Sequence, residues 1–336
     1  MSIHITTVDD DAFDRWNDNV ARSEHGTPFH RFETLRVLAA ETDTELHLLV
    51  GYKGEEPVGL FPVFEMSRPA VSAVFSPPPD LRIPALGPIL LGVDGMKRGR
   101  RERRHLRFIE RCLEWLDAEF SSVGRYMHCR TGARYTDLRP FRWNGFRVSP
   151  EFTYVVDIDR DESDLLSAFS RDARTNVRAL DREDCTVEVG DIHAIEPITE
   201  QVRSRYAEQG HSYHITPAFV RDLYRSLPEG HVRPYVCTVD GEFAGGVLTL
   251  ETQDTIYRWQ GAADHDVDIP VSDVLDWWII SDARERGIER YDFVGASTQR
   301  LNRYKAKFDP ELRAYHSVER GGPVMNLIAS LYVRLR

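Results

Sequence analysis

Two stretches of the chain share one pattern of apolar runs and short polar turns. The first, "LHLLVGYKGEEPVGLFPVFE" at 46–65, has a turn at 53–55 between two apolar runs. The second, "RPYVCTVDGEFAGGVLTLE" at 233–251, has Asp240-Gly241 at the corresponding point. A glycine-containing turn between two β-rich runs is typical of a β-hairpin. Each stretch therefore predicts a hairpin, and Gly59 and Gly245 take matching places in the second strand of each.

The segments that flank the two hairpins also correspond. Each half opens with a short strand and has a helix just before its hairpin. After the hairpin come a third strand, an amphipathic helix, a glycine and a strand that begins Arg-Tyr. In the first half these segments are "HITTV" (4–8), "RFETLRVLAA" (31–40), "AVSAVFS" (70–76) and "HLRFIERCLEWLDAEFSSVGRYMHC" (105–129). In the second half they are "TYVVDID" (153–159), "PAFVRDLYRSL" (217–227), "DTIYRWQGA" (254–262) and "SDVLDWWIISDARERGIERYDFVGA" (272–296).

This repetition predicts two domains of one plan, 1–150 and 151–336, with the boundary near Ser149-Pro150. The fold class is α+β, or mixed α/β, with a mixed and largely antiparallel sheet in each domain and helices packed against it. A chain of 336 residues with 41% hydrophobic residues is long enough to build two separate cores. We expect the second domain to carry most of the active site.

Composition excludes several other classes of protein. The net charge of −11 argues against a DNA-binding protein. Apolar stretches fall short of the ~20 residues that a membrane span needs, and no signal peptide is visible at the N-terminus, so we expect a soluble, cytoplasmic protein. The four cysteines form no Cys-x-x-Cys pair, and His211 and His214 lack further ligands nearby in sequence, so we expect reduced thiols and no metal.

The order of these elements resembles the GNAT acyltransferase fold. Its doubling resembles the Fem-type aminoacyl transferases, the non-ribosomal peptidyltransferases that extend bacterial cell-wall peptides. At residue level the resemblance lies in the second half, in "TYVVDIDRDESDLLSAFSRDARTNVRAL", "IYRWQGA", "PVSDVLDWWIISDARERGIERYDFVGAS" and "RYKAKFDPELRAY". The last of these is similar to the family's aromatic-Lys-x-x-Phe element, with Tyr304, Lys305 and Phe308 in the matching places. The resemblance implies an acyltransferase with tandem domains.

The segment between the third strand and the following helix departs from the usual GNAT pattern. GNAT enzymes that bind acyl-coenzyme A hold its pyrophosphate with Gln/Arg-x-x-Gly-x-Gly/Ala at a helix N-terminus. Here the sequence is "GAADHDVDIPVSDV", with Asp264, Asp266 and Asp268 instead of a glycine loop. Three carboxylates repel a pyrophosphate, so the donor stays open between an acyl-coenzyme A and an aminoacyl-tRNA. We expect no tightly bound cofactor.

Two residues are candidates for catalysis. The chain has only four lysines against 39 arginines, yet Lys305 and Lys307 lie two residues apart. An ammonium at Lys305 can follow a developing oxyanion as a compact point charge, whereas a guanidinium fork is larger and more rigid. Asp292 begins an apolar strand, where a raised pKa would suit a proton acceptor. The alternatives are solvated lysines on a polar turn and a structural carboxylate at Asp292.

Four further residues are candidates for binding the donor. Arg174 and Arg178 belong to a row of arginines on the predicted helix "SDLLSAFSRDARTNVRALDRED", and such a row can grip phosphates. Tyr257 and Trp259 lie on the strand before the acidic segment and could line a cleft. Pairing with surface carboxylates explains the arginines equally well, and core packing explains the two aromatic residues.

These observations predict an N-acyltransferase of the GNAT or Fem-like type that transfers an acyl or aminoacyl group to an amine. The acceptor would be a small molecule or a peptide-like amine, and tRNA is a possible partner. The alternatives are an aminoacyl-tRNA-dependent peptidyltransferase and a non-catalytic ligand-binding protein on the same fold.

Overall fold

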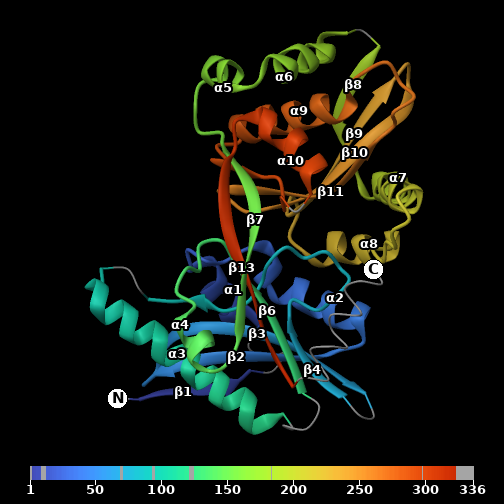
Figure 1. Cartoon of the computed structure of the whole chain (residues 1–336). Coiled ribbons are helices and arrows are strands. Elements are labelled where there is room, and N and C mark those ends of the chain that lie inside the picture. The colour runs from blue at the N-terminus through green and yellow to red at the C-terminus, as the bar shows by residue number, and fades with distance from the viewer. Residues whose placement is uncertain are drawn as a thin grey trace. The chain divides into compact units, whose positions relative to one another are not determined.

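The structure is a computed structural model that describes residues 2–8, 13–68, 71–92, 95–120, 125–182, 184–296 and 298–322. The chain divides into two compact units, which are described separately below (Figure 1). Unit 1 comprises Met1–Glu151 and Ala314–Arg336, and unit 2 comprises Phe152–Arg313. The C-terminal segment 323–336, "PVMNLIASLYVRLR", lies outside the described residues.

Unit 1 contains a sheet with helices packed against it. Its strands are β1 (Ile3–Thr7), β2 (Glu45–Lys53), β3 (Glu56–Arg68), β4 (Val71–Ser76), β5 (Ile89–Leu90) and β6 (Arg125–Thr131). Its helices are α1 (Phe13–Ala21), η2 (Pro28–His30), α2 (Phe32–Thr42), α3 (Arg98–Glu119) and α4 (Arg139–Trp143). Two more strands, β7 (Arg147–Asp157) and β13 (Glu311–Gly321), belong partly to each unit.

Unit 2 repeats this organisation. Its own strands are β8 (Cys185–Val189), β9 (Val232–Val239), β10 (Glu242–Glu251), β11 (Thr255–Ala263) and β12 (Arg290–Asp292). Its α-helices are α5 (Glu162–Ala168), α6 (Arg171–Asn176), α7 (Ile195–Glu208), α8 (Pro217–Ser226), α9 (Val271–Glu285) and α10 (Gln299–Lys305). Its 3-10 helices are η3 (Val177–Asp181), η4 (Ile192–Ala194) and η5 (Ala306–Phe308).

The two units have matching strand orders. In unit 1 the order is β1-β2-β3-β4-β6-β13, and in unit 2 it is β8-β9-β10-β11-β12-β7. The pairs β4–β6 and β11–β12 are parallel, and the other described pairs are antiparallel. The predicted fold class, a mixed and largely antiparallel sheet in each half, is confirmed. The correspondence also shows that β1 matches β8, and not the "TYVVDID" strand that the sequence pattern paired with it.

Two strands, β7 and β13, cross the division between the units. The chain enters unit 2 in the middle of β7, after Glu151, and β7 then pairs with β12 through Val155, Val156 and Asp157. It leaves unit 2 in the middle of β13, after Arg313, and β13 then pairs with β6. The predicted division at Ser149-Pro150 placed all of β13 with the second domain. Ser149 and Pro150 lie within β7.

The glycines at corresponding positions of the two hairpins are required for a steric reason. Gly51 and Gly59 face each other across β2 and β3, and a Cβ on either would meet the ring of Phe108 from α3. In unit 2 a Cβ on Gly245 would lie 2.8 Å from Val271 of α9, and a Cβ on Gly246 would lie 2.4 Å from Ile198 of α7. Neighbouring residues of a strand point to opposite faces, so α9 and α7 cover opposite faces of this sheet.

The predicted helix over 163–184 is broken into three short pieces. Ser170 ends the first piece and caps the second, because its hydroxyl accepts a hydrogen bond from the N–H of Ala173 (3.2 Å). The backbone N–H of Ser170 donates to the carbonyl of Lys307 (2.8 Å), which fixes α6 against η5. Among the apolar residues of these pieces, Leu165, Phe169, Ala173 and Val177 are buried, while Leu166 and Leu180 are only partly buried.

Among the described residues, no helix is both long enough and apolar enough to cross a membrane.

We expect Gly59→Ala to destabilise unit 1. The added methyl would approach Phe108 to 2.4 Å, and Phe108 is fully buried, so its ring has no room to move. Overpacking of this kind costs about 1–3 kcal/mol. Urea unfolding followed by circular dichroism measures the change. Gly132→Ala is the matched control, since a Cβ there meets nothing within 4 Å; an equal loss in both variants would contradict the steric explanation.

Candidate functional site

The parallel strand pair of unit 2 separates soon after it begins. Only Thr255, Ile256 and Tyr257 of the nine-residue strand β11 pair with β12, which ends at Asp292. Strand β11 continues to Ala263, and within the described residues this part of its edge has no strand partner. In unit 1, by contrast, β4 pairs with β6 over five of its six residues. An open edge presents backbone N–H and C=O groups that can bind an extended, amide-rich ligand.

The chain that leaves β12 forms a turn, residues 293–296, whose backbone N–H groups are all bonded within unit 2. Phe293 donates to the carbonyl of Tyr154 (2.9 Å), and Ala296 donates to the carbonyl of Phe152 (2.7 Å). Between them, Val294 donates to Asp292 Oδ1 (2.8 Å) and Gly295 donates to Thr153 Oγ1 (3.0 Å). These contacts hold the turn away from β11.

The backbone of this turn is strained at Val294. Its φ is +53°, in the left-handed region that β-branched residues rarely adopt, and Gly295 follows with φ +87°. Strain of this kind persists only where the surroundings enforce it, and it is concentrated at functional sites. The hydrogen bonds of residues 293–296 are the enforcing contacts.

Lys305, a predicted catalytic residue, binds the carbonyl side of the same turn. The residue is 5% exposed, and its ammonium donates to the carbonyls of Phe293 (2.9 Å), Val294 (3.2 Å) and Gly295 (2.6 Å). Burial lowers the pKa of Lys305 to about 8, with a further lowering by Arg258, while Asp292 and Asp276 oppose it. The three carbonyl dipoles favour the protonated form. All three N–H donors of the ammonium are therefore engaged inside the protein.

Asp292, the other predicted catalytic residue, lies on the opposite side of this turn. Its Oδ1 accepts from the hydroxyl of Thr153 (2.6 Å) as well as from the N–H of Val294. Burial raises the pKa of Asp292, and the hydrogen bonds from Thr153 and Val294 counteract part of that rise. The structure thus brings Asp292 and Lys305 together on residues 293–296. Their catalytic roles stay predictions.

Asp276, a buried carboxylate that sequence analysis did not identify, joins the elements that lie near this turn. Asp276 of α9 is fully buried and pairs with Arg258 of β11, with 2.5 Å between Nε and Oδ1. It also accepts hydrogen bonds from the hydroxyls of Tyr291 (2.6 Å) and Tyr304. Burial raises the pKa of both tyrosines, so both stay protonated donors. This cluster ties α9, β11, β12 and α10 together.

Lys307 is partly buried, and so neither lysine occupies a fully solvated turn. Its side chain is 13% exposed and forms an ion pair with Asp273 in the first turn of α9. The ammonium also lies 4.5 Å from the centre of the Tyr304 ring, within cation–π distance. Burial raises the pKa of Asp273, and Lys307 opposes that shift.

The loop between α7 and α8 reaches the open part of β11. Tyr213 stacks on Tyr206 and donates its hydroxyl to Gln260 Oε1 (3.1 Å) on β11. Gln209, at the start of this loop, accepts from Arg300 of α10 (3.4 Å). The predicted donor-binding residues on this strand were Tyr257 and Trp259, and Gln260 was not among them. A buried Gln in an apolar strand is the signal that could have found it.

The four residues predicted to bind the donor have different surroundings. Arg174 donates to the carbonyls of Ser167 and Phe169 (both 2.9 Å), at the end of α5. Arg178 is exposed on η3. Trp259 is buried against Phe219 of α8, and Tyr257 lies opposite Asp292 in the strand register. No hydrogen bond or ion pair between described residues joins Arg174 or Arg178 to Asp292 or Lys305, and donor binding by all four residues stays a prediction.

The N-terminus of α9 is poorly suited to an anion. The N–H of Val271 bonds the carbonyl of Ile269 (2.8 Å), and those of Asp273 and Val274 bond the carbonyl of Pro270 (2.9 and 3.1 Å). The side chain of Asp273 adds a buried carboxylate in the first turn. The preceding segment carries Asp264, Asp266 and Asp268. These N–H groups at the start of α9 are thus already hydrogen-bonded, and the nearby carboxylates counteract the positive end of the helix dipole, which would otherwise attract a phosphate.

Comparison with known proteins identifies the fold. Residues 167–306 match the family model of an acetyltransferase (GNAT) domain, which covers most of unit 2. The crystal structure of FemX superposes with a TM-score of 0.71 at 12% identity, over 93% of this chain and 96% of that one. The C-terminal domain of a putative lysylphosphatidylglycerol synthetase from Agrobacterium fabrum gives 0.57 at 13% identity, over 95% of each chain.

A tandem GNAT protein from the clavulanic acid biosynthesis pathway gives a TM-score of 0.51 at 13% identity, over 96% of this chain and 99% of that one. No curated protein sequence matches the chain. The expected twin-GNAT fold, similar to that of FemX, is confirmed. With its acetyltransferase (GNAT) domain, the chain is an acyltransferase of this fold.

We expect Arg258→Met to destabilise unit 2 strongly. The substitution leaves the carboxylate of Asp276 buried without its cation, and breaking a buried pair in this way costs about 3–5 kcal/mol. Urea unfolding measures the loss. The double variant Arg258→Met/Asp276→Leu is the control, because it removes both charges and should recover part of the stability. A double variant less stable than Arg258→Met would contradict this assignment.

Proposed function

We propose that unit 2 carries the transfer site and that the chain moves an acyl or aminoacyl group to an amine. The observation that supports this proposal is the separation of β11 from β12 after three paired residues, at a turn held by Asp292 and Lys305. The corresponding pair in unit 1 stays closed along β4. The opened pair offers backbone groups to a donor and places charged groups beside it.

The donor that this site suits best is an aminoacyl ester, as in an aminoacyl-tRNA. GNAT folds generally use acyl-coenzyme A, whose pyrophosphate needs free N–H groups at a helix N-terminus. In this chain the N–H groups of Val271, Asp273 and Val274 at the start of α9 bond backbone carbonyls, and Asp273 and three loop aspartates add negative charge. A compact diphosphate is therefore disfavoured at this position.

The reaction is a direct attack within a ternary complex. The amine nitrogen of the acceptor forms a bond to the carbonyl carbon of the donor, and the bond to the leaving oxygen breaks. The amine loses a proton, for which Asp292 is the proposed acceptor, because burial raises the pKa of its carboxylate. The leaving alkoxide takes up a proton from water.

Lys305 contributes through the turn that it holds. Its ammonium fixes three carbonyls and keeps residues 293–296 apart from β11. The same charge raises the electrostatic potential at the open edge, where negative charge develops on the carbonyl oxygen of the donor. We therefore assign Lys305 a positioning role in the proposed mechanism, in place of direct contact with the donor.

A transfer assay with two donor classes tests the proposed function. The full chain is incubated with radiolabelled aminoacyl-tRNA or with acetyl-coenzyme A, and with amino sugars, peptides and polyamines as acceptors. We expect label to pass to an amine acceptor from the aminoacyl-tRNA. Transfer from acetyl-coenzyme A alone would overturn the choice of donor. Thermal shifts with deacylated tRNA but no transfer to any acceptor would support the non-catalytic alternative.

Substitution of the two lysines separates positioning from general stability. We expect Lys305→Met to lower the transfer rate by about 10²-fold, because the turn loses its support and a displacement of about 1 Å at a reacting group has that cost. Lys307→Met leaves Asp273 unpaired and should lower the urea midpoint, with little effect on the transfer rate per folded molecule. Rates are normalised to the folded fraction from circular dichroism. Equal rate losses in both variants would point to diffuse electrostatic attraction instead.

A further inference from the structure

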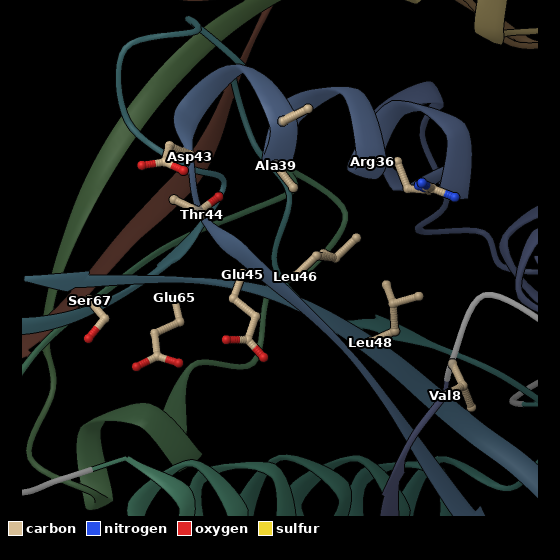
Figure 2. A pocket seen from close by; sticks show the side chains of 11 residues that line it. Val8, Arg36, Ala39, Asp43, Thr44, Glu45, Leu46, Leu48, Glu65 and Ser67 are labelled. Carbon is tan, nitrogen blue, oxygen red and sulfur yellow. The ribbon is translucent and has the colours of Figure 1, made fainter.

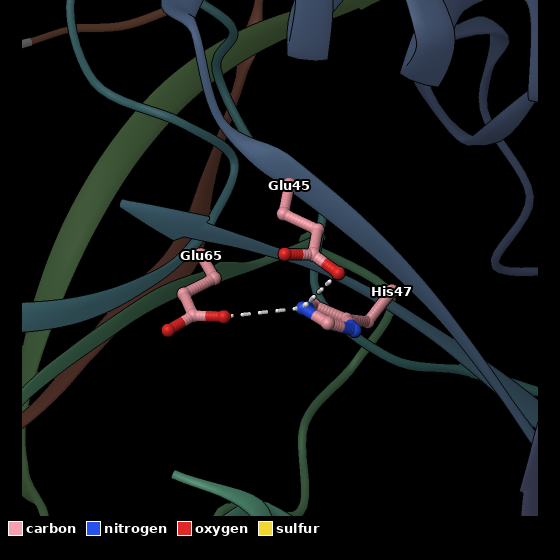
Figure 3. Close-up of side chains that lie close together, drawn as sticks. All are labelled: Glu45, His47 and Glu65. Atoms are coloured by element: carbon pink, nitrogen blue, oxygen red, sulfur yellow. Dashed lines mark ion pairs between the residues drawn. The ribbon is translucent and has the colours of Figure 1, made fainter. Parts of the chain in front are cut away.

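Three side chains of unit 1 converge on one point away from the candidate transfer site. Glu45 and His47 lie on β2, and Glu65 lies on β3 (Figure 3). One potential ligand atom from each residue lies within 4.8 Å of the others. The Nε2 atom of His47 is 3.5 Å from Glu65 Oε2 and 4.0 Å from Glu45 Oε1, which is beyond ordinary hydrogen-bond contact.

The register of the sheet places two like charges directly opposite each other. Glu45 is the cross-strand partner of Glu65. Like charges in this position destabilise a sheet. No Lys or Arg forms an ion pair with either carboxylate in the described part of the chain, and His47 is their shared neighbour. A cation between the two carboxylates would remove the repulsion.

The imidazole of His47 supplies an independent indication of a ligand. Its Nε2 atom is buried and has no hydrogen-bond partner, an arrangement that costs free energy. The ring packs against Trp115 and Phe120, with centroid distances of 6.1 and 5.3 Å, and these contacts orient it toward the carboxylates. A nitrogen atom held unsatisfied beside two carboxylate oxygens is a preformed set of metal ligands.

We propose that Glu45, His47 and Glu65 bind a divalent transition-metal ion, with Zn²⁺ as the preferred ion. Zinc accepts nitrogen and oxygen ligands at about 2.0–2.2 Å, so tetrahedral ligands lie about 3.4 Å apart, and the observed separations of 3.5 and 4.0 Å need little movement. Mg²⁺ and Ca²⁺ prefer oxygen ligands throughout, and an imidazole disfavours them. Three protein ligands leave the fourth position of the ion open.

The three ligand side chains are accessible to an ion from solvent. The side chain of Glu45 is 73% exposed, whereas those of His47 and Glu65 are 15% and 19% exposed. The hydroxyl of Ser72 donates to the second oxygen of Glu65 (3.4 Å), which helps to orient that carboxylate. Glu45 and Glu65 also line a cavity of about 880 Å³ next to α2, and their carboxylates point away from that helix (Figure 2). Solvent and a dissolved cation therefore reach the ligands.

Calorimetry with the untagged full chain tests the site. The protein is stripped with EDTA, dialysed, and titrated with ZnCl₂ and, separately, with MgCl₂. We expect one Zn²⁺ per chain and much weaker binding of Mg²⁺. His47→Gln and Glu65→Gln should each weaken Zn²⁺ binding by more than about 100-fold, since even indirect partners of a ligand are worth 10–100-fold. His4→Gln, on the neighbouring strand β1, is the matched control and should bind as the parent chain does.

Thermal unfolding distinguishes a metal ion from a protonated His47. With a metal site, Zn²⁺ raises the melting temperature of the parent chain, and Glu65→Gln abolishes that rise while stabilising the metal-free chain. If an imidazolium bridges the carboxylates instead, Glu65→Gln destabilises the metal-free chain and Zn²⁺ has no effect on the parent. That result, or unchanged Zn²⁺ affinity in both ligand variants, would overturn the proposal.

Discussion

The candidate site depends on one buried ammonium that donates to three consecutive backbone carbonyls. The carbonyls of Phe293, Val294 and Gly295 converge on Lys305, whose tetrahedral head has three donors that point in different directions. A planar guanidinium presents its donors in one fork and does not fit three convergent acceptors. Burial lowers the pKa of this ammonium, and the carbonyl dipoles oppose the change. This is the physical reason for a lysine in a chain that otherwise favours arginine.

The same contact explains why the two units differ although their sheets have one strand order. In unit 1 the parallel pairing with β6 continues along β4, and so the backbone groups on the facing edges of these two strands are paired with each other. In unit 2 the left-handed conformation of Val294 turns the chain away from β11 after Asp292. That strained conformation is stabilised by hydrogen bonds, from Lys305 to the carbonyl groups of the turn and from the N–H groups of the turn to Thr153 and Asp292. One copy of the duplicated fold is thus a closed sheet, and the other has an open edge.

Much of the fold could be predicted from the sequence because its signals are local. The Asp240-Gly241 turn, the paired glycines and the helical period of 105–120 each follow from a few neighbouring residues. The division of β7 and β13 between the two units could not be predicted, because nothing local tells which strands a given strand will pair with. The boundary predicted near Ser149-Pro150 lies inside β7, because a proline is tolerated in a strand wherever the ladder does not need its N–H.

The candidate site was predictable only in part, for a related reason. Lys305 was predicted because it lies in a motif similar to that of a known family, and Asp292 because a carboxylate in an apolar strand suits a proton acceptor. Asp276 lies in the apolar helix segment "VLDWWII", where one carboxylate looks like the polar face of an ordinary helix. Its role depends on Arg258, Tyr291 and Tyr304, which come from three other elements and meet it only in the folded chain.

The distribution of negative charge bears on the choice of donor. A coenzyme carries its phosphates within a few bonds of one another, so its diphosphate must lie close to the acyl group, where this chain has Asp264, Asp266, Asp268 and Asp273. A tRNA spreads its phosphates along a polymer, and its ester lies at one end. That end can enter a site whose surroundings are acidic while most of the phosphates bind elsewhere. Repulsion from the aspartates therefore acts against a compact diphosphate far more than against an aminoacyl ester on a long polyanion.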